Sequence, residues 1–248
     1  MTKPYQDGKA PQNRSSGNTF TTLTIHRAPG RRRDAAWIER RLQDPTTRFL
    51  PVWQSKVLVS HASPPQMTWL TPEEATEHIQ QAESVILLEE DGGHTYFALN
   101  LPASHETPPR SLSRKGRFRR LRAIAALLDR EAAALLGYAK AMVHYHSQHR
   151  FCPACGAPTI AKEGGHLRIC TNAQCSQLDF PRTDPAIIAL VTSGERCLLG
   201  RQATWPQSLY SIIAGFVEPG ESLEAAVVRE VWEETGVQVE QMHYHSSQ

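Results

Sequence analysis

The sequence has 248 residues, of which 40% are apolar and 21% charged, and its formal net charge is +2. This length suits one or two domains, and the composition excludes a fibrous repeat or a wholly disordered acidic chain. Apolar stretches fall well short of the roughly 20 residues of a membrane span, and the N-terminus lacks a secretory signal. We therefore expect no membrane partner and a cytoplasmic location.

Residues 1–19 are polar and rich in Gly, Pro, Asn and Ser, which predicts a disordered tail. Residues 20–116 read as a small α+β domain. Within it, Thr71-Pro-Glu-Glu74 combines a capping threonine, a proline and an acid, which predicts a helix start. Residues 84–88 and 95–99 flank a turn with two glycines, which predicts a β-hairpin. This region shows no catalytic constellation, and its expected role is structural support or dimerisation.

Residues 117–149 have apolar positions at helical spacing and are expected to form a mostly helical connector, interrupted near Asp129. The approach to this connector is basic, with seven cations and no acid: Arg110, Arg114, Lys115, Arg117, Arg119, Arg120 and Arg122. A phosphate-binding surface and a solvated helix face both explain this run. Three histidines near the connector's end, His144, His146 and His149, are expected at the surface or as helix caps.

Four of the five cysteines fall within 24 residues, at Cys152, Cys155, Cys170 and Cys175. Two thiolate pairs joined by a short hairpin can close a tetrahedral zinc site, and Gly156 lets the chain turn around the ion. We predict a structural zinc ribbon over residues 150–179, with free or redox-active thiols as the alternative. The fifth cysteine, Cys197, is expected as a buried strand residue.

Residues 180–248 begin with strands expected at 185–191, 196–200 and 209–213, and a glycine-rich loop then leads into a charged helix. Ser222 is placed to cap this helix and Gly236 to end it. Three acids at positions i, i+3 and i+4, Glu230, Glu233 and Glu234, share one arc of the helix. Carboxylates on one arc indicate a Mg²⁺ or Mn²⁺ site, although a glutamate-rich helix is more often a solvated face.

The surroundings of these glutamates match the pattern GX5EX7REUXEEXGU, with U apolar, at every specified position from Gly215 to Val237. This pattern resembles the Nudix box. The cysteine ribbon upstream and the segments 179–188 and 214–220 look like the NADH pyrophosphatase branch of the Nudix family. The resemblance implies an α+β chain that acts as a homodimer. The domains are expected in the order N-terminal Nudix-like domain, zinc ribbon and Nudix α/β/α sandwich.

The same resemblance implies hydrolysis of NADH or NAD⁺ to AMP and nicotinamide mononucleotide, with NAD-capped RNA as a further substrate. It assigns metal contacts to the carbonyl of Ala214 and to Glu230, Glu233 and Glu234, and Glu233 can also activate water. Arg229 has an orienting role. Substrate contacts are assigned to Phe180, Arg122 and Gln248. A different class of function stays open: a zinc-ribbon RNA-binding module with an inactive or incomplete Nudix domain.

Eleven residues follow Val237, and the last two, Ser247 and Gln248, match the start of the family motif SQPWPFPxS. This motif is associated with the dinucleotide specificity of the branch. Residues 180–248 are therefore expected to form an incomplete sandwich with exposed apolar surface and unpaired strand edges. On this basis we expect the chain alone to be poorly active and prone to aggregation.

Overall fold

The computed structural model describes residues 14–21, 25–104 and 106–248. The chain divides into two compact units, one of residues 1–181 with 246–248 and one of residues 182–245. The first 13 residues of the predicted disordered tail lie outside the described part. The prediction is wrong for Arg14–Gly17, which form a 3-10 turn (η1) closed by a bond from Asn18 N to Ser15 O of 3.0 Å.

A mixed five-stranded sheet forms the centre of the first unit, in the order β3-β4-β1-β2-β5. The strands are β1 (Thr47–Trp53), β2 (Lys56–Val59), β3 (Ser84–Asp91), β4 (His94–Leu101) and β5 (Arg117–Arg120). The β1–β4 pair is parallel and the other pairs are antiparallel. The predicted hairpin is confirmed as β3–β4, where Gly92 and Gly93 both adopt positive φ.

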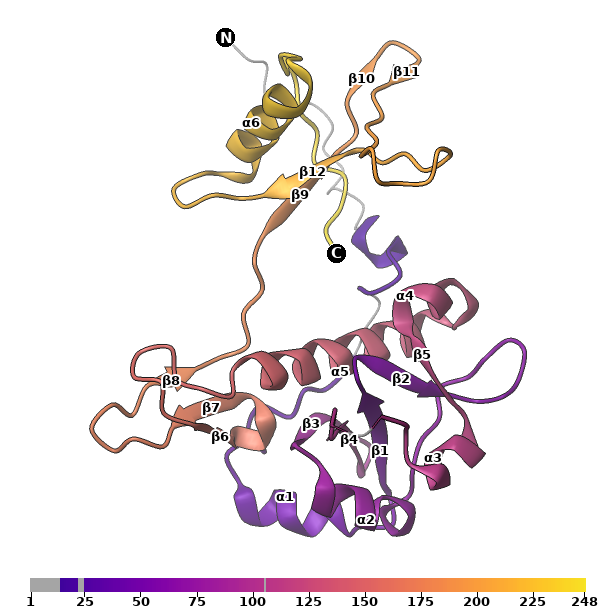
Figure 1. Ribbon diagram of the computed structural model, residues 1–248, viewed down its shortest axis with the longest axis vertical. Helices are drawn as coiled ribbons and strands as arrows, with labels where there is room; N and C mark the ends of the chain where they lie inside the picture. The colour runs from indigo at the N-terminus through magenta and orange to yellow at the C-terminus, as the bar shows by residue number, and fades with distance from the viewer. Residues whose placement is uncertain (1–13, 22–24, 105) are drawn as a thin grey trace. The chain divides into compact units, whose positions relative to one another are not determined.

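Helices cover both faces of this sheet (Figure 1). One face packs against α5 (Arg130–Gln148), and the other against α1 (Ala35–Leu42), α2 (Pro72–Gln81) and α3 (Arg110–Lys115). The strands can be apolar on both sides because each face is buried, as the burial of Phe49 and Leu50 at successive positions shows. The predicted α+β class is confirmed.

Capping residues begin α2 and α5 where the sequence predicted. The capping box at Thr71 is present, with Glu74 N bonded to Thr71 Oγ1 and Thr71 N to Glu74 Oε2. Asp129 caps α5, so the predicted interruption is confirmed. The prediction of helix is wrong for residues 117–120, which form edge strand β5 because they pair with β2. The chain then continues through α4 (Leu121–Ile124) and the 3-10 turn η2 (Ala125–Leu127).

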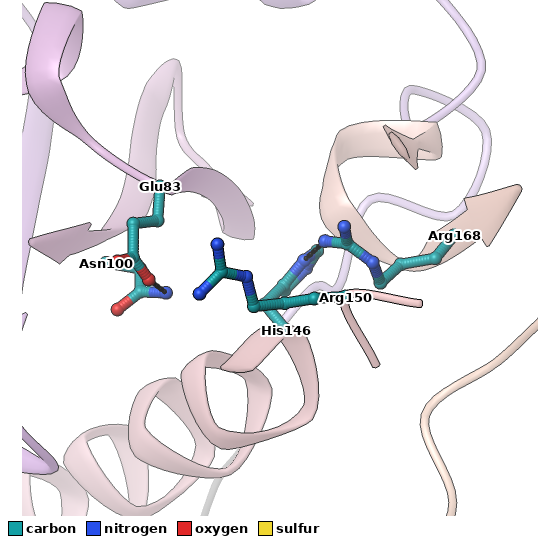
Figure 2. Close-up of a pocket in the computed structure, with 5 residues that line it drawn as sticks. All are labelled: Glu83, Asn100, His146, Arg150 and Arg168. Atoms are coloured by element: carbon teal, nitrogen blue, oxygen red, sulfur yellow. Dashed lines mark hydrogen bonds between the residues drawn. The ribbon is translucent and has the colours of Figure 1, made fainter. Parts of the chain in front are cut away.

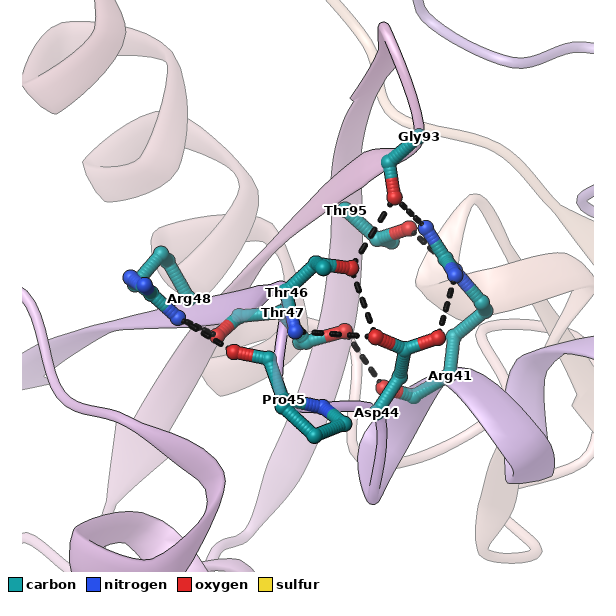
Figure 3. A network of polar contacts seen from close by, with 8 residues as sticks. All are labelled: Arg41, Asp44, Pro45, Thr46, Thr47, Arg48, Gly93 and Thr95. Atoms are coloured by element: carbon teal, nitrogen blue, oxygen red, sulfur yellow. Dashed lines mark hydrogen bonds and ion pairs between the residues drawn. The ribbon is translucent and has the colours of Figure 1, made fainter.

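A polar network fastens the end of α1 to the sheet (Figure 3). Arg41 donates from Nε to Thr95 Oγ1 at 2.7 Å, from Nη1 to Asp44 Oδ2 at 2.5 Å, and from Nη2 to the Gly93 carbonyl. Bonds from Thr46 hold the pKa of Asp44 below its usual value. The network thus joins the loop before β1 to the β3–β4 turn, at positions far apart in sequence.

The ribbon consists of β6 (Thr159–Lys162), the 3-10 turn η3 (Glu163–Gly165), β7 (Leu167–Cys170) and β8 (Leu178–Asp179), all paired antiparallel. Its turn lies against β3. A Cβ on Gly165 would stand 3.0 Å from Ile86 Cγ1, and φ at Gly165 is +87°. His166 adds a bond from Nε2 to the Leu87 carbonyl at 2.7 Å. The ribbon and the sheet are therefore packed as one unit.

The second unit contains β9 (Ala186–Ala189), β10 (Thr192–Ser193), β11 (Arg196–Cys197), β12 (Ile213–Phe216) and α6 (Leu223–Thr235). Strands β9 and β12 pair antiparallel, and α6 packs against them through Ala226 and Val231. The third strand was predicted at 209–213 but lies at 213–216, where Ile213 is buried while Leu209 stays half exposed. Cys197 lies in a strand as predicted but is exposed, because that strand is a two-residue hairpin arm.

Within residues 14–21, 25–104 and 106–248, no helix is both long enough and apolar enough to cross a membrane.

Candidate metal centre and glutamate helix

The four ribbon cysteines converge on one point. Their Sγ atoms all lie within 4.8 Å of one another, with Cys152–Cys175 at 3.7 Å and Cys155–Cys170 at 3.4 Å. A tetrahedral zinc site with Zn–S bonds of about 2.3 Å requires sulfur atoms about 3.8 Å apart, so the cluster fits zinc. All four thiols are free of disulfides. With four protein ligands the centre is closed, which is the arrangement of a structural site.

Backbone turns place these thiols. Gly156 adopts φ +74°, and its N–H bonds to the Cys152 carbonyl at 2.9 Å. A backbone N–H of Ala157 directed at the Cys155 sulfur lowers the pKa of that thiol to about 7. Cys152 and Cys170 are buried, whereas Cys155 is exposed. The local geometry therefore favours thiolate, the form that binds metal, at Cys155, whereas burial raises the pKa of Cys170 to about 12.

The second feature is helix α6, whose ends follow the sequence signals. Ser222 Oγ accepts from Ala225 N at 3.1 Å, and Gly236 closes the helix in the left-handed conformation with φ +69°. Ala226 and Val231 are fully buried, whereas Val228 is 43% exposed. The helix is thus anchored by a narrow apolar face, and Glu233 and Glu234 are exposed.

Arg229 bonds to several acidic side chains on and before this helix. Its guanidinium forms a bidentate ion pair with Glu221 at 2.7 and 2.9 Å, and also donates to the Phe216 carbonyl at 2.9 Å. Nη1 reaches Glu230 Oε1 at 2.9 Å and Glu233 Oε2 at 3.2 Å. This pairing lowers the pKa of Glu221 to about 2 and raises the pKa of Arg229. Arg229 therefore ties the loop before α6 to the helix itself.

Gly215 makes room for Glu230. A Cβ at position 215 would lie 1.9 Å from Glu230 Oε1 and 2.0 Å from Glu230 Cδ, so only glycine allows the carboxylate to occupy this place beside β12. The sequence pattern contained this glycine, but its spacing alone did not show that Glu230 is what it accommodates. We expected Gly215 in a loop, whereas it lies within a strand.

The glutamates offer oxygen ligands of the kind that hard divalent cations prefer. Glu230 and Glu233 both accept from Arg229 Nη1, while Glu234 is exposed. Among the described residues, the cysteines form the one group of three or more His, Cys, Asp or Glu whose ligand atoms gather closely. The donor chemistry thus fits a divalent cation, and its binding would require the carboxylates to draw together.

Comparison with known proteins accounts for both features. Family models match three successive parts of the chain: an NADH pyrophosphatase-like rudimentary NUDIX domain at 46–144, an NADH pyrophosphatase zinc ribbon domain at 147–178 and a NUDIX domain at 182–248. An NAD-capped RNA hydrolase of Schizosaccharomyces pombe is 31% identical over 273 residues, covering 92% of this chain and 73% of that protein. The chain belongs to the NADH pyrophosphatase branch of the Nudix hydrolase family.

Two further relatives match over shorter stretches. Chloroplastic Nudix hydrolase 19 of Arabidopsis thaliana is 46% identical over 117 residues, which is 46% of this chain and 27% of that protein. Human mitochondrial NAD(P)H pyrophosphatase NUDT13 is 36% identical over 174 residues, or 67% of this chain and 49% of that protein. This Nudix chain thus spans between about a quarter and a half of these two relatives.

The remaining predicted site residues lie apart from the glutamate helix in sequence. Ala214 is an exposed residue of β12, paired with Ile188. Phe180 is 54% exposed between β8 and β9, Arg122 is exposed in α4, and Gln248 is exposed at the last described position. Their roles remain predictions from the Nudix resemblance.

The three histidines near the end of α5 lie in different environments. As expected, His144 is exposed, and His149 donates from Nδ1 to the Tyr145 carbonyl at 2.8 Å at the end of α5. His146, expected at the surface or as a cap, is instead 2% exposed, because the ribbon covers it and its ring bonds to the Gly165 carbonyl and to Arg168. Sequence reasoning missed this buried pair, since only the folded ribbon brings β7 beside α5.

Proposed function

We propose that this chain, as part of its Nudix protein, hydrolyses the diphosphate bond of NADH or NAD⁺ to AMP and nicotinamide mononucleotide, and removes NAD caps from RNA. The observation that carries the proposal is the Arg229-centred arrangement in a complete Nudix box, where Gly215 accommodates Glu230 beside the strand. The names of the relatives, an NAD-capped RNA hydrolase and an NAD(P)H pyrophosphatase, support the substrate class.

In this proposal Glu230, Glu233 and Glu234 hold Mg²⁺ or Mn²⁺, and the carbonyl of Ala214 adds a contact. When bound, the cation neutralises the diphosphate and promotes attack of water at phosphorus. Arg229 positions two of these carboxylates, Glu230 and Glu233, through the hydrogen bonds that it donates to them. The side chain of Glu233 is 57% exposed, so water can reach its carboxylate, which would take up the proton of the attacking water.

Substitution Glu234→Gln tests the proposal on the complete protein. The exchange keeps the shape of the side chain but removes one negative charge, so Mg²⁺-dependent turnover of NADH should fall by at least a hundredfold while NADH binding persists. Glu240→Gln is the matched control, because Glu240 is exposed in the same unit and lies outside the box. Equal turnover in both variants would remove the proposed site.

RNA binding without hydrolysis is the second candidate, and the basic run favours it. The seven cations of residues 110–122 leave the rest of the chain with 20 basic and 25 acidic residues, so positive charge is concentrated there. Edge strand β5 exposes Arg117, Arg119 and Arg120. Under this reading the Glu234→Gln variant binds single-stranded RNA normally, with strong salt dependence, and the parent shows no NADH turnover.

The proposal also includes the homodimer that the family resemblance implies and the cytoplasmic location expected from the sequence. Light scattering of the purified protein tests the first point, with a mass of one chain as the contradicting result. Microscopy of the tagged protein tests the second, and the relatives named as chloroplastic and mitochondrial show which other locations must be scored.

A further inference from the structure

A polar cavity of about 190 Å³ lies within the first unit, lined by Glu83, Asn100, His146, Arg150 and Arg168 (Figure 2). These residues come from three parts of the fold. Glu83 directly precedes β3 and Asn100 lies in β4, His146 and Arg150 lie at and just after the end of α5, and Arg168 lies in ribbon strand β7. The cavity therefore lies where the sheet, the helix and the zinc ribbon meet. Junctions of this kind are frequent ligand sites.

The floor of the cavity holds a buried cation. Arg168 is 7% exposed and donates from Nε to Thr159 Oγ1 at 2.7 Å and from Nη2 to the Thr159 carbonyl at 2.8 Å. Its Nη1 bonds to His146 Nδ1 at 2.8 Å. All these partners are neutral, and among the described residues Arg168 forms no ion pair within 4.0 Å. A buried charge ordinarily has a counter-charge, so the floor of the cavity favours an anion.

His146 orients the guanidinium of Arg168. Its Nε2 bonds to the Gly165 carbonyl at 2.8 Å, so the ring proton is on Nε2 and Nδ1 accepts from Arg168. Burial lowers the pKa of His146 to about 4, so the ring is neutral near pH 7. Arginine stays protonated in proteins, so the guanidinium of Arg168 keeps its charge. Its bond to His146 holds its orientation.

The rim adds a second cation and an acceptor. Arg150 is exposed, and its side chain extends between the Glu83–Asn100 pair and the His146–Arg168 pair (Figure 2). Asn100, 5% exposed, donates from Nδ2 to Glu83 Oε2 at 3.3 Å. The lining therefore offers two guanidinium groups and, across the cavity, a carboxylate. A ligand that suits both must join an anionic group to hydroxyl donors.

We propose that this cavity binds the sugar-phosphate part of a phosphate monoester, with the phosphate on Arg150 and Arg168 and the sugar hydroxyls on Glu83. Guanidinium groups match the geometry of phosphate oxygens, and a carboxylate accepts from hydroxyls. The volume is smaller than the roughly 300–1,000 Å³ of sites for larger ligands, which limits the occupant to a fragment of this size. The site belongs to the first unit and is independent of the proposed hydrolysis.

Calorimetry on the zinc-loaded full chain, without added Mg²⁺ or Mn²⁺, tests the proposal with three probes: ribose 5-phosphate, inorganic phosphate and ribose. Ribose 5-phosphate should bind at least tenfold more tightly than inorganic phosphate, and ribose should give no heat. The side-chain amide signal of Asn100 in NMR spectra should move during the titration. Absence of binding by ribose 5-phosphate at millimolar concentration, or equal binding of ribose, would overturn the proposal.

Variants locate the binding. Arg150→Gln should raise the Kd for ribose 5-phosphate at least tenfold, or about 1.4 kcal/mol, without unfolding the chain, because Arg150 is exposed. Glu83→Gln should weaken ribose 5-phosphate more than inorganic phosphate. Arg40→Gln, an exposed position on α1, is the matched control and should bind as the parent does. Equal Kd values for the Arg150 and Arg40 variants would place the ligand elsewhere and refute the assignment.

Discussion

Substitution Gly215→Ala perturbs the contact between β12 and Glu230. The new Cβ would stand 1.9 Å from Glu230 Oε1, whereas carbon atoms in ordinary contact are about 3.5–4.0 Å from their neighbours. The carboxylate must therefore move by about 1.5 Å or more, which breaks its 2.9 Å bond to Arg229 Nη1. A hydrogen bond to a charged group contributes about 1.5–3 kcal/mol, and Arg229 keeps its two bonds to Glu221.

We therefore expect Gly215→Ala to lower the free energy of unfolding by about 1–2 kcal/mol, measured by urea denaturation. The effect on Mg²⁺-dependent NADH turnover should be larger, about a hundredfold, because displacement of a catalytic group by about 1 Å has consequences of that size. The two measurements together separate a positioning effect from simple loss of stability.

Gly200→Ala is the matched control. A Cβ at position 200 meets its nearest atom, Ile213 Cδ1, at 3.9 Å, which is ordinary contact, and the backbone bonds between Gly200 and Ser211 need no change. Its stability should stay within about 0.5 kcal/mol of the parent. If Gly215→Ala matches this control in both unfolding and turnover, then Glu230 does not depend on the space at Gly215.

Three further predictions concern charge and metal. In Arg229→Gln the pKa of Glu221 should return from about 2 toward its ordinary value, which NMR titration of the carboxyl group measures. In the parent, the Arg229–Glu221 pair stabilises the fold above about pH 4.5, and this contribution is lost as the pH falls toward 2. Burial lowers the pKa of His166 to about 4, so neutral His166 stabilises the fold fully above about pH 6.5, and this contribution disappears as pH falls to 4. His166→Gln should flatten that part of the stability profile in thermal melts, and an unchanged profile would assign the acid sensitivity to other groups. Cys152→Ser, or zinc removal by a chelator, should lower the zinc content and melting temperature of the first unit, since zinc binding is coupled to folding, whereas Cys197→Ser should change neither.

Several structural details of this chain were determined by residues close together in sequence. The capping box at Thr71, the caps at Ser222 and Gly236, the glycine turn of the β3–β4 hairpin and the paired cysteines all depend on backbone geometry over a few residues. The helical part of the Nudix box belongs to this class too, because Glu230, Glu233 and Glu234 lie within two turns of one helix. For these elements, spacing along the chain is enough to predict the arrangement.

Other features needed the tertiary structure because they join segments that no local pattern relates. Residues 117–120 became a strand through pairing with β2, and the strand expected at 209–213 moved to 213–216 through pairing with β9. The contact of Gly215 with Glu230 and the burial of His146 beside Arg168 likewise arise only when helix, sheet and ribbon pack together. The sequence by itself determined which groups are present and how each helix and turn begins and ends. The fold decided which of them share a site, since burial and pairing between distant segments are properties of the whole packed unit.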